Sequence, residues 1–262
     1  MTMAHWLLVG GALFGLGVDG GTPTDGGARD GGAISTKGVV APGPRTGPER
    51  SPLAPEVKAL VDKVQAFYER TRDFTADFRQ DYTYAAARRS TSSSGTVMYK
   101  RSAQMRWEYS KPSPRTFVLV QDRAYMYDPQ AKLVTRASIN TNQLSASVTF
   151  LWGQGKLADE FAITKKSCPE CEAVAPAHPK ATVLLELVPF EPDPRFKKVH
   201  LEVDPATAQV VKSTVFDPDG SVNAIAFLNL KTNAGVEDKA FKLSLPPGTQ
   251  VQDFLVADAG VK

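Results

Sequence analysis

Two cysteines and three histidines are the residues of this chain best suited to nucleophilic, redox or metal chemistry. The cysteines form the motif Cys168-Pro169-Glu170-Cys171, in a polar loop between two strand-like segments. In an exported chain this spacing favours a local disulfide that tightens the loop. A redox pair would need a helix N-terminus to lower the pKa of one thiol, and zinc would need four ligands where only His178 lies nearby. We therefore expect a Cys168–Cys171 disulfide and no metal.

Catalysis has little material in the rest of the chain. His5, His178 and His200 lie in three separate segments, and the sequence has neither a G-x-S-x-G elbow nor an H-E-x-x-H helix. The segment from Gly153 to Ala158 matches G-x-G-x-x-A by letter. It follows a helix-like segment instead of a strand, which favours a helix cap over a dinucleotide site. We expect a protein that is not an enzyme and has no cofactor.

Aromatic and cationic residues are instead concentrated in two strand-like segments between Gly95 and Pro112. Alternate residues of a β-strand point to the same face of the sheet. One face would then combine apolar side chains with a guanidinium: Val97, Tyr99, Arg101, Met105, Trp107 and Tyr109. Such a face suits a lined cavity better than an active site. An ordinary core for the aromatic residues, and an exit to solvent for Arg101, are the alternatives.

Composition bounds the class of protein. The chain has 262 residues, 42% of them hydrophobic, and a net charge of +3 with acids and bases interspersed, which argues against a nucleic-acid partner. Residues 1–18 resemble a secretory signal, with a buried helix as the alternative. Residues 19–55 are rich in Gly and Pro and are expected to be a disordered linker. The folded domain is then expected to span residues 56–256.

Hydrophobic periodicity predicts one long helix followed by many strands. Apolar residues between Pro55 and Tyr68 follow helical spacing, and residues 74–84 alternate as a strand does. The serine-rich segment 88–94 is expected to be a turn, and residues 140–153 are expected to hold a short helix. Further strands are expected at 95–101, 105–109, 117–120, 125–127, 133–137, 161–163, 183–187, 198–203, 210–216, 222–228 and 241–245.

Turn residues separate most of these strands, and no helix of useful length stands between neighbouring ones. This organisation favours antiparallel hairpins over parallel βαβ units. A sheet of so many strands is expected to curve strongly. The sequence therefore predicts an α+β domain in which a barrel-like or half-barrel sheet is covered by helices.

A succession of short motifs runs in order along the chain from Val57 to Phe254. Its elements are Phe74-x-Ala76-x-Phe78-x-Gln80, Gly95 to Arg101, Met105-Arg106-Trp107-Glu108-Tyr109, Lys111-Pro112, Tyr125-x-Tyr127-Asp128-Pro129, Phe150-Leu151-x-Gly153, Phe161, Leu187-x-Pro189, Asp217-x-x-Gly220, Phe227-x-Asn229, Phe241 and Pro246-Pro247-Gly248. No single element is diagnostic, but in this ordered set the chain resembles the LolA-type periplasmic carriers of outer-membrane lipoproteins.

The resemblance implies an incomplete (half) antiparallel β-barrel with an α-helical lid, and a cavity for acyl chains. Arg101 falls where the family has its lid-fastening arginine, which implies a latch to backbone carbonyls of the lid. Two departures are Ser102, where the family has proline, and Asp122-Arg123, where it has Asp-Gly. The implied cavity residues are Phe78, Val97, Tyr99, Met105, Trp107, Phe117, Tyr125, Tyr127, Phe150 and Leu151.

The function implied by the resemblance is that of a monomeric periplasmic carrier. Its partners would be acylated lipoproteins, an inner-membrane ABC-type lipoprotein-releasing complex as donor, and an outer-membrane acceptor. A periplasmic sensor of envelope stress with the same fold is the alternative. Such sensors usually carry a further domain, for which we expect no room after Phe254. A lipid-handling enzyme would need a cluster of His, Ser and Asp that the sequence does not offer.

Overall fold

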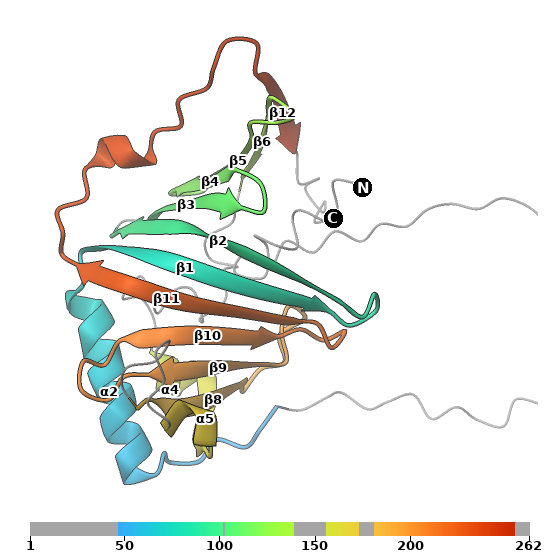
Figure 1. Ribbon diagram of the computed structural model, residues 1–262. Helices are drawn as coiled ribbons and strands as arrows, with labels where there is room; N and C mark the ends of the chain where they lie inside the picture. The colour runs from blue at the N-terminus through green and yellow to red at the C-terminus, as the bar shows by residue number, and fades with distance from the viewer. Residues whose placement is uncertain (1–46, 102, 139–155, 173–180, 255–262) are drawn as a thin grey trace, which may run out of the picture.

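The computed structural model describes residues 47–101, 103–138, 156–172 and 181–254. The predicted signal segment, residues 19–46 of the predicted linker and the helix predicted within 140–153 lie outside these ranges. The described residues form helix α2, one large sheet and three short helical segments (Figure 1). No helix among them is long and apolar enough to cross a membrane.

Helix α2 (Pro55–Arg70) forms where the sequence predicts it. Pro55 occupies the first turn, where its missing N–H costs no hydrogen bond. Thr71 ends the helix in an extended conformation, and its backbone N–H bonds to the carbonyl oxygen of Tyr68. One stripe of the helix is buried: Val57, Val61, Val64 and Tyr68. The helix is therefore stabilised mainly by packing of this stripe against the sheet.

Within the described residues, twelve strands form one open sheet in the order β12-β6-β5-β4-β3-β2-β1-β11-β10-β9-β8-β7 (Figure 1). Neighbours are antiparallel, except that β12 runs parallel to β6. The strands are β1 (Asp73–Tyr84), β2 (Arg89–Lys100), β3 (Gln104–Lys111), β4 (Arg115–Val120), β5 (Arg123–Asp128), β6 (Leu133–Ser138), β7 (Phe161–Lys166), β8 (Val183–Pro189), β9 (Lys198–Val203), β10 (Val210–Phe216), β11 (Val222–Thr232) and β12 (Gln250–Phe254). Because β12 and β7 are the two ends of this order, the sheet is an incomplete barrel, as predicted.

The strand register shows that α2 and the aromatic segment lie on the same face of the sheet. Side chains paired across an antiparallel ladder point to one face. Val215 of β10 pairs with Asn223 of β11, and Asn223 pairs with Tyr82 of β1. Alternation along β1 then gives Tyr82 and Phe78 the same face. Val215 packs in the cluster that contains α2, and Phe78 packs in the aromatic cluster. We call this shared face the inner face.

Two hydrophobic clusters divide the inner face. The first joins the buried stripe of α2 to residues of β7–β10 such as Leu185, Leu187 and Val199. The second lies on β1–β5 and β11, and its ten buried members are Phe74, Ala76, Phe78, Val97, Tyr99, Met105, Trp107, Leu119, Ala124 and Ile225. We call this second set the aromatic cluster. Helix α2 therefore covers one half of the inner face, and the aromatic cluster occupies the other half.

The described end of the predicted linker, residues 47–54, contains no helix or strand but contacts the end of the β7–β8 hairpin. Arg50 donates a hydrogen bond to the carbonyl oxygen of Asp159 (2.8 Å), and its guanidinium lies 4.4 Å from the centre of the Phe190 ring. A side chain on Gly47 would collide with the carbonyl oxygen of Phe190, since a Cβ there would lie 1.9 Å from it. Ordered contacts therefore begin before α2.

The serine-rich segment is a strand, and the turn predicted at 88–94 was wrong. The chain turns at Ala85–Arg88, and β2 then pairs with β1 along its whole length, from Tyr84–Arg89 to Asp73–Lys100. The serines tolerate this because the ladder uses only backbone groups and the segment lies at the end of a long hairpin. The length of the partner strand β1, and not the serine content, therefore determines where this hairpin turns.

The strand predicted at 241–245 was also wrong. Residues Asp238–Phe241 form a short 3-10 helix, η3, that contacts β3 and β4, and Phe241 is buried. The carbonyl oxygens of Ala240 and Lys242 accept hydrogen bonds from Arg106 on the opposite, outer face of the sheet. Those carbonyls are therefore turned toward a guanidinium instead of a neighbouring strand. The chain continues to β12, a strand that the sequence analysis did not predict.

Candidate functional site

Val97, Tyr99, Met105 and Trp107 meet on the inner face because β2 and β3 pair in one register. Val97 is opposite Trp107, and Tyr99 is opposite Met105. All four side chains are buried, with Val97 and Tyr99 completely inaccessible to solvent. The period of two that the sequence suggested for these strands therefore corresponds to one continuous apolar surface.

Phe78 links the aromatic residues of β1 and β3 across Gly95. Its ring lies edge-on to Trp107 and to Tyr109, with centroids 4.8 and 5.0 Å apart. Gly95 of β2 is paired with Phe78 of β1 on one side and with Tyr109 of β3 on the other. A Cβ at Gly95 would lie 1.8 Å from the carbonyl oxygen of Glu108. The missing side chain at Gly95 thus allows β3 to approach β2 closely while the ring of Phe78 lies against it.

Phe117 continues this surface on β4, but Tyr125 and Tyr127 do not. Phe117 is opposite Trp107 and packs against the aromatic cluster. Tyr125 is opposite Val118, the neighbour of Phe117, and Tyr127 is opposite Thr116. Both tyrosines therefore point to the outer face. This face differs from that of the other predicted cavity residues on β1–β4, because the two-residue turn after Val120 fixes a register that gives the inner face to other residues of β5.

The remaining members of the predicted cavity, Phe150 and Leu151, lie outside the described residues. The structure adds cluster members that were not among the predicted cavity residues, including Phe74, Leu119 and Ile225. Phe74 has the same strand parity as Phe78, so alternation within β1 was a signal for it. Leu119 and Ile225 needed the register of β4 and β11, which no pattern within one strand provides.

A polar group marks one end of the aromatic cluster. Tyr109 donates its hydroxyl hydrogen bond to Gln80 (3.1 Å), and the amide of Gln80 donates to Asn223 (2.9 Å). Gln80 and Asn223 are almost fully buried. Nearby, Tyr82 donates to Asp217 (2.9 Å). Buried polar groups at this end of the face are thus hydrogen-bonded, as folded proteins require.

Two polar atoms within the aromatic cluster are different. The hydroxyl of Tyr99 and the indole Nε1 of Trp107 are buried and have no hydrogen-bond partner among the residues that the structure describes. Burial raises the pKa of Tyr99, with an opposing effect from the nearby charge of Arg101. The hydroxyl therefore stays protonated near neutral pH and, like the indole N–H, is a hydrogen-bond donor without an acceptor.

Arg101 contacts the C-terminal end of α2. Its Nη2 donates to the carbonyl oxygens of Tyr68 (3.4 Å), Thr71 (3.3 Å) and Glu69. The last carbonyls of a helix lack partners within the helix, and the helix dipole favours a cation beside them. The backbone N–H of Arg101 also bonds to the carbonyl oxygen of Arg72 (2.7 Å). The side chain therefore ties the end of α2 to the β2–β3 turn.

The hollows on the outer face have a different chemistry. The larger, of about 790 Å³, spans β1–β4 and β11, and polar and charged side chains such as Asp77, Arg79 and Glu108 line it. An apolar chain gains free energy by leaving water for apolar contacts, which this surface offers sparsely. Of these two surfaces, the aromatic cluster on the inner face is the better candidate for apolar ligands.

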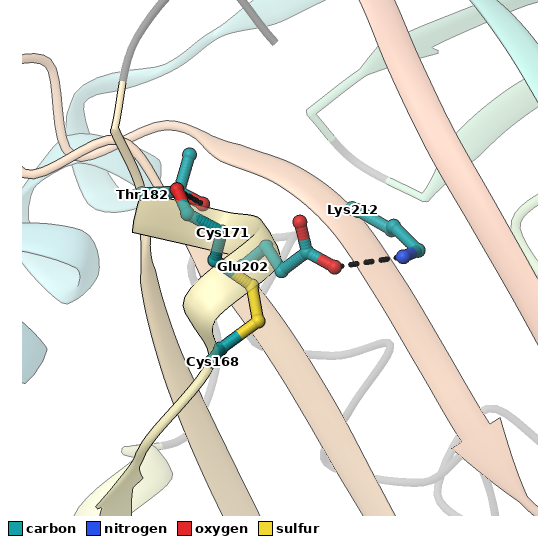
Figure 2. Close-up of a disulfide and its surroundings, with 5 residues drawn as sticks. All are labelled: Cys168, Cys171, Thr182, Glu202 and Lys212. Atoms are coloured by element: carbon teal, nitrogen blue, oxygen red, sulfur yellow. Dashed lines mark hydrogen bonds and ion pairs between the residues drawn. A yellow bond between two sulfur atoms is a disulfide. The ribbon is translucent and has the colours of Figure 1, made fainter. Parts of the chain in front are cut away.

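Cys168 and Cys171 form a disulfide around the start of the short helix α5 (Pro169–Glu172), with Cα atoms 5.2 Å apart. Figure 2 shows it together with the ion pair of Glu202 and Lys212 (2.8 Å), two residues paired across the β9–β10 ladder on the outer face. The carbonyl oxygen of Cys171 accepts a hydrogen bond from the backbone N–H of Thr182 (2.9 Å). Both cysteines are buried. The disulfide lies beside the outer-face residue Glu202 (Figure 2), so it stabilises a loop on the face opposite the aromatic cluster.

Glu186 is the centre of a cationic group on the outer face of β7–β10. It accepts contacts from Lys198 (2.6 Å), Lys166 (2.9 Å) and His200 (2.9 Å). Partial desolvation acts to raise the pKa of Glu186, but hydrogen bonds from Lys198, Lys166 and His200 outweigh it and lower the pKa to about 2. The group is accounted for as a surface ion-pair network. No set of three His, Cys, Asp or Glu side chains suited to a metal ion occurs in the described ranges.

An open antiparallel sheet that carries one helix and a buried aromatic cluster on the same face defines a LolA-like fold. The sequence model of the family described as "Outer membrane lipoprotein carrier protein LolA" matches residues 69–244. The chain therefore belongs to the LolA family, which confirms the resemblance seen in the sequence. Because this is a family of carriers, membership also confirms that the protein is not an enzyme.

Relatives with assigned names are similar over most of their length. The outer-membrane lipoprotein carrier protein of Dechloromonas aromatica is 27% identical over 191 residues, which are 73% of this chain and 86% of that protein. The carrier of the same name from Cupriavidus necator is 23% identical, over 76% of this chain and 90% of that protein. Among solved structures, an uncharacterized conserved protein from Thermus thermophilus has a TM-score of 0.49 and 12% identity, with 76% of this chain and 99% of that chain covered.

Proposed function

We propose that this protein is a periplasmic carrier that binds the acyl chains of lipoproteins on its inner face and moves them from the inner to the outer membrane. The observation that carries the proposal is the aromatic cluster, centred on Phe78, Tyr99 and Trp107, in a chain of the LolA family. Acyl chains gain about 0.8 kcal/mol for each buried CH₂ group. A carrier must therefore shield them from water and still release them.

The cavity wall in this proposal consists of Phe78, Val97, Tyr99, Met105 and Trp107, with Phe117 beside Trp107 on β4. Their common support is the register of β1–β4, which points all of them to the inner face. Helix α2 is the lid, because it lies on the same face over β7–β10. Phe150 and Leu151 stay predicted members of the wall.

Arg101 is the latch in this proposal. Its hydrogen bonds to the C-terminal carbonyls of α2 hold the helix in the position described here. If cargo binds only after α2 moves, these bonds subtract from the binding free energy because they keep the open state a minor population. Breaking them on opening, and forming them again on release, would drive cargo out of the cavity.

The partners follow from this cycle. Acylated lipoproteins are the cargo, an inner-membrane ABC-type lipoprotein-releasing complex is the donor, and an outer-membrane protein is the acceptor. The protein acts as a monomer in the periplasm after export by its predicted signal segment. No cofactor takes part, because binding and release need only apolar contacts and the Arg101 bonds.

Isolation of the protein with its cargo tests the proposal. The full chain is purified from the periplasm, and co-purifying lipoproteins are identified by mass spectrometry. We expect triacylated lipoproteins with the wild type and none with Trp107→Glu, which places a carboxylate among apolar side chains. Circular dichroism checks that the variant is folded, and Trp107→Phe is the matched apolar control. A wild-type protein free of cargo and inert toward acylated peptides would refute the carrier function.

A further inference from the structure

The inference concerns the two unpartnered donors in the aromatic cluster, the Tyr99 hydroxyl and Trp107 Nε1. Both side chains are at least nine-tenths buried, with exposed fractions of 0% and 4%. A buried donor without an acceptor costs free energy, and folded proteins contain few of them. Two such donors in one cluster therefore indicate an acceptor group that the described residues do not supply.

Other buried tyrosines of this protein have partners. The hydroxyl of Tyr68 accepts a hydrogen bond from the backbone N–H of Val210 (3.3 Å), and the hydroxyl of Tyr82 donates to Asp217 (2.9 Å). The hydroxyls of these two buried tyrosines, one on α2 and one on β1, are therefore hydrogen-bonded. The exception at Tyr99 lies within the aromatic cluster, beside the ring of Phe74, and an acceptor position that a ligand fills would explain it.

The two donors are close enough in the sheet to act on one ligand. Tyr99 of β2 is opposite Met105, and Trp107 of β3 is opposite Val97, so Tyr99 and Trp107 are diagonal neighbours on one face. Such neighbours lie roughly 7–8 Å apart at the backbone, within reach of aromatic side chains. Phe74 and Phe78 pack against them, with ring centroids 5.2 Å from Tyr99 and 4.8 Å from Trp107.

A ligand suited to this position is mostly apolar and carries two hydrogen-bond acceptors but no donors. We propose that Tyr99 and Trp107 donate hydrogen bonds to the ester carbonyl oxygens of a diacylglyceryl group, and so make the cavity selective for ester-linked acyl chains. The inference rests on the proposed carrier function and names the part of the cargo that the cavity recognises. Arg101 lies close enough to Tyr99 for its charge to act on the hydroxyl, so a carboxylate such as a free fatty acid is the competing source of the same oxygen chemistry.

The test compares two probes that differ only at the carbonyls: a cysteine-containing peptide with a dipalmitoyl diester, and its dihexadecyl diether. The full chain is titrated with each in detergent-free buffer. We expect the wild type to bind the diester about three- to tenfold more tightly, as about one net hydrogen bond predicts. Palmitate is the third probe, and we expect it to bind no better than the diether.

Tyr99→Phe removes one donor and keeps the ring. We expect it to lose most of the ester preference while the thermal stability of the unliganded protein stays equal or rises, because an unsatisfied buried hydroxyl is gone. Tyr82→Phe is the matched control, since its hydroxyl has a partner. It should lower the thermal stability and keep the ester preference. A merely structural role of Tyr99 would predict the reverse stability change.

The outcomes separate the inference from the function on which it rests. Equal binding of diester and diether by the wild type, or an ester preference that survives in Tyr99→Phe, overturns the inference and leaves the carrier function intact. Palmitate binding that exceeds diester binding and depends on Tyr99 overturns the ester assignment in favour of a carboxylate. Failure of the wild type to bind any of the three probes overturns the carrier function itself.

Discussion

Replacement of Arg101 by leucine should make the protein bind acylated cargo more tightly and release it more slowly. In the structure Nη2 of Arg101 donates to the carbonyl oxygens of Tyr68 and Glu69 in α2 and of Thr71 just after it. The distances to Tyr68 and Thr71 are long, at 3.4 and 3.3 Å, so we count the three contacts as about one hydrogen bond. A hydrogen bond from a charged donor contributes about 1.5–3 kcal/mol when it is well shielded. Because Arg101 is exposed, solvent screening reduces this to about 1–2 kcal/mol.

The latch energy sets a ceiling on the change in affinity. If the open state is the competent one, the apparent dissociation constant is the intrinsic value divided by the open fraction. Loss of about 1–2 kcal/mol from the closed state therefore lowers the apparent dissociation constant by about five- to thirtyfold. Arg101→Lys keeps the charge but not the planar donor group, so it should lie between the wild type and Arg101→Leu.

The assay has a binding part and a release part. A fluorescent diacylated peptide is titrated to obtain the dissociation constant, and its transfer to phospholipid vesicles gives the release rate. Arg136→Leu is the matched control, because it removes an arginine that pairs with Asp253 (2.7 Å) between β6 and β12, away from α2. Wild-type affinity and release in Arg101→Leu, with α2 still folded by circular dichroism, would refute the latch.

Three further predictions concern stability. The pKa of Glu186 is about 2 in the folded protein and near 4.5 in the unfolded chain, so the carboxylate stabilises the fold fully above about pH 4.5 and loses this effect as the pH falls toward 2. The free energy of unfolding should therefore drop by up to about 3 kcal/mol between pH 4.5 and 2, and Glu186→Gln should remove that drop. Gly95→Ala should lower the unfolding free energy in urea by about 2 kcal/mol or more, because the new Cβ would lie 1.8 Å from the Glu108 carbonyl oxygen; a wild-type value would contradict the close approach. Replacement of Cys168 and Cys171 by serine should cost about 2 kcal/mol in thermal unfolding, as a short loop predicts, and leave probe binding unchanged because the loop lies on the outer face.

Local patterns in the sequence predicted most of the elements. Strict alternation in residues 74–84 and the helical stripe from Pro55 to Tyr68 correspond to β1 and α2. Both patterns arise because a half-buried element repeats its apolar residues with its own period. The strands at 198–203 and 210–216 have the predicted bounds. The information for each of these elements is contained within the element.

The face on which each strand presents its aromatic residues needed more. Tyr125 and Tyr127 have the composition of cavity residues, but Val120 pairs with Arg123 across the turn, and this register puts both tyrosines on the outer face. A shift of one residue in register exchanges the two faces of a strand. The length of the turn at Gln121-Asp122 contained the information on this register, whereas the composition of β5 did not.

By itself, the sequence determined the family, the antiparallel half-barrel, the long first helix and the concentration of aromatic residues between Gly95 and Pro112. Only the tertiary structure decided which of those residues share a face, that Arg101 reaches the end of α2, and that Tyr99 and Trp107 lack hydrogen-bond partners within the described part of the chain. The physical reason is that periodicity is a property of one segment, whereas register, burial and hydrogen-bond satisfaction are properties of segments far apart in the chain.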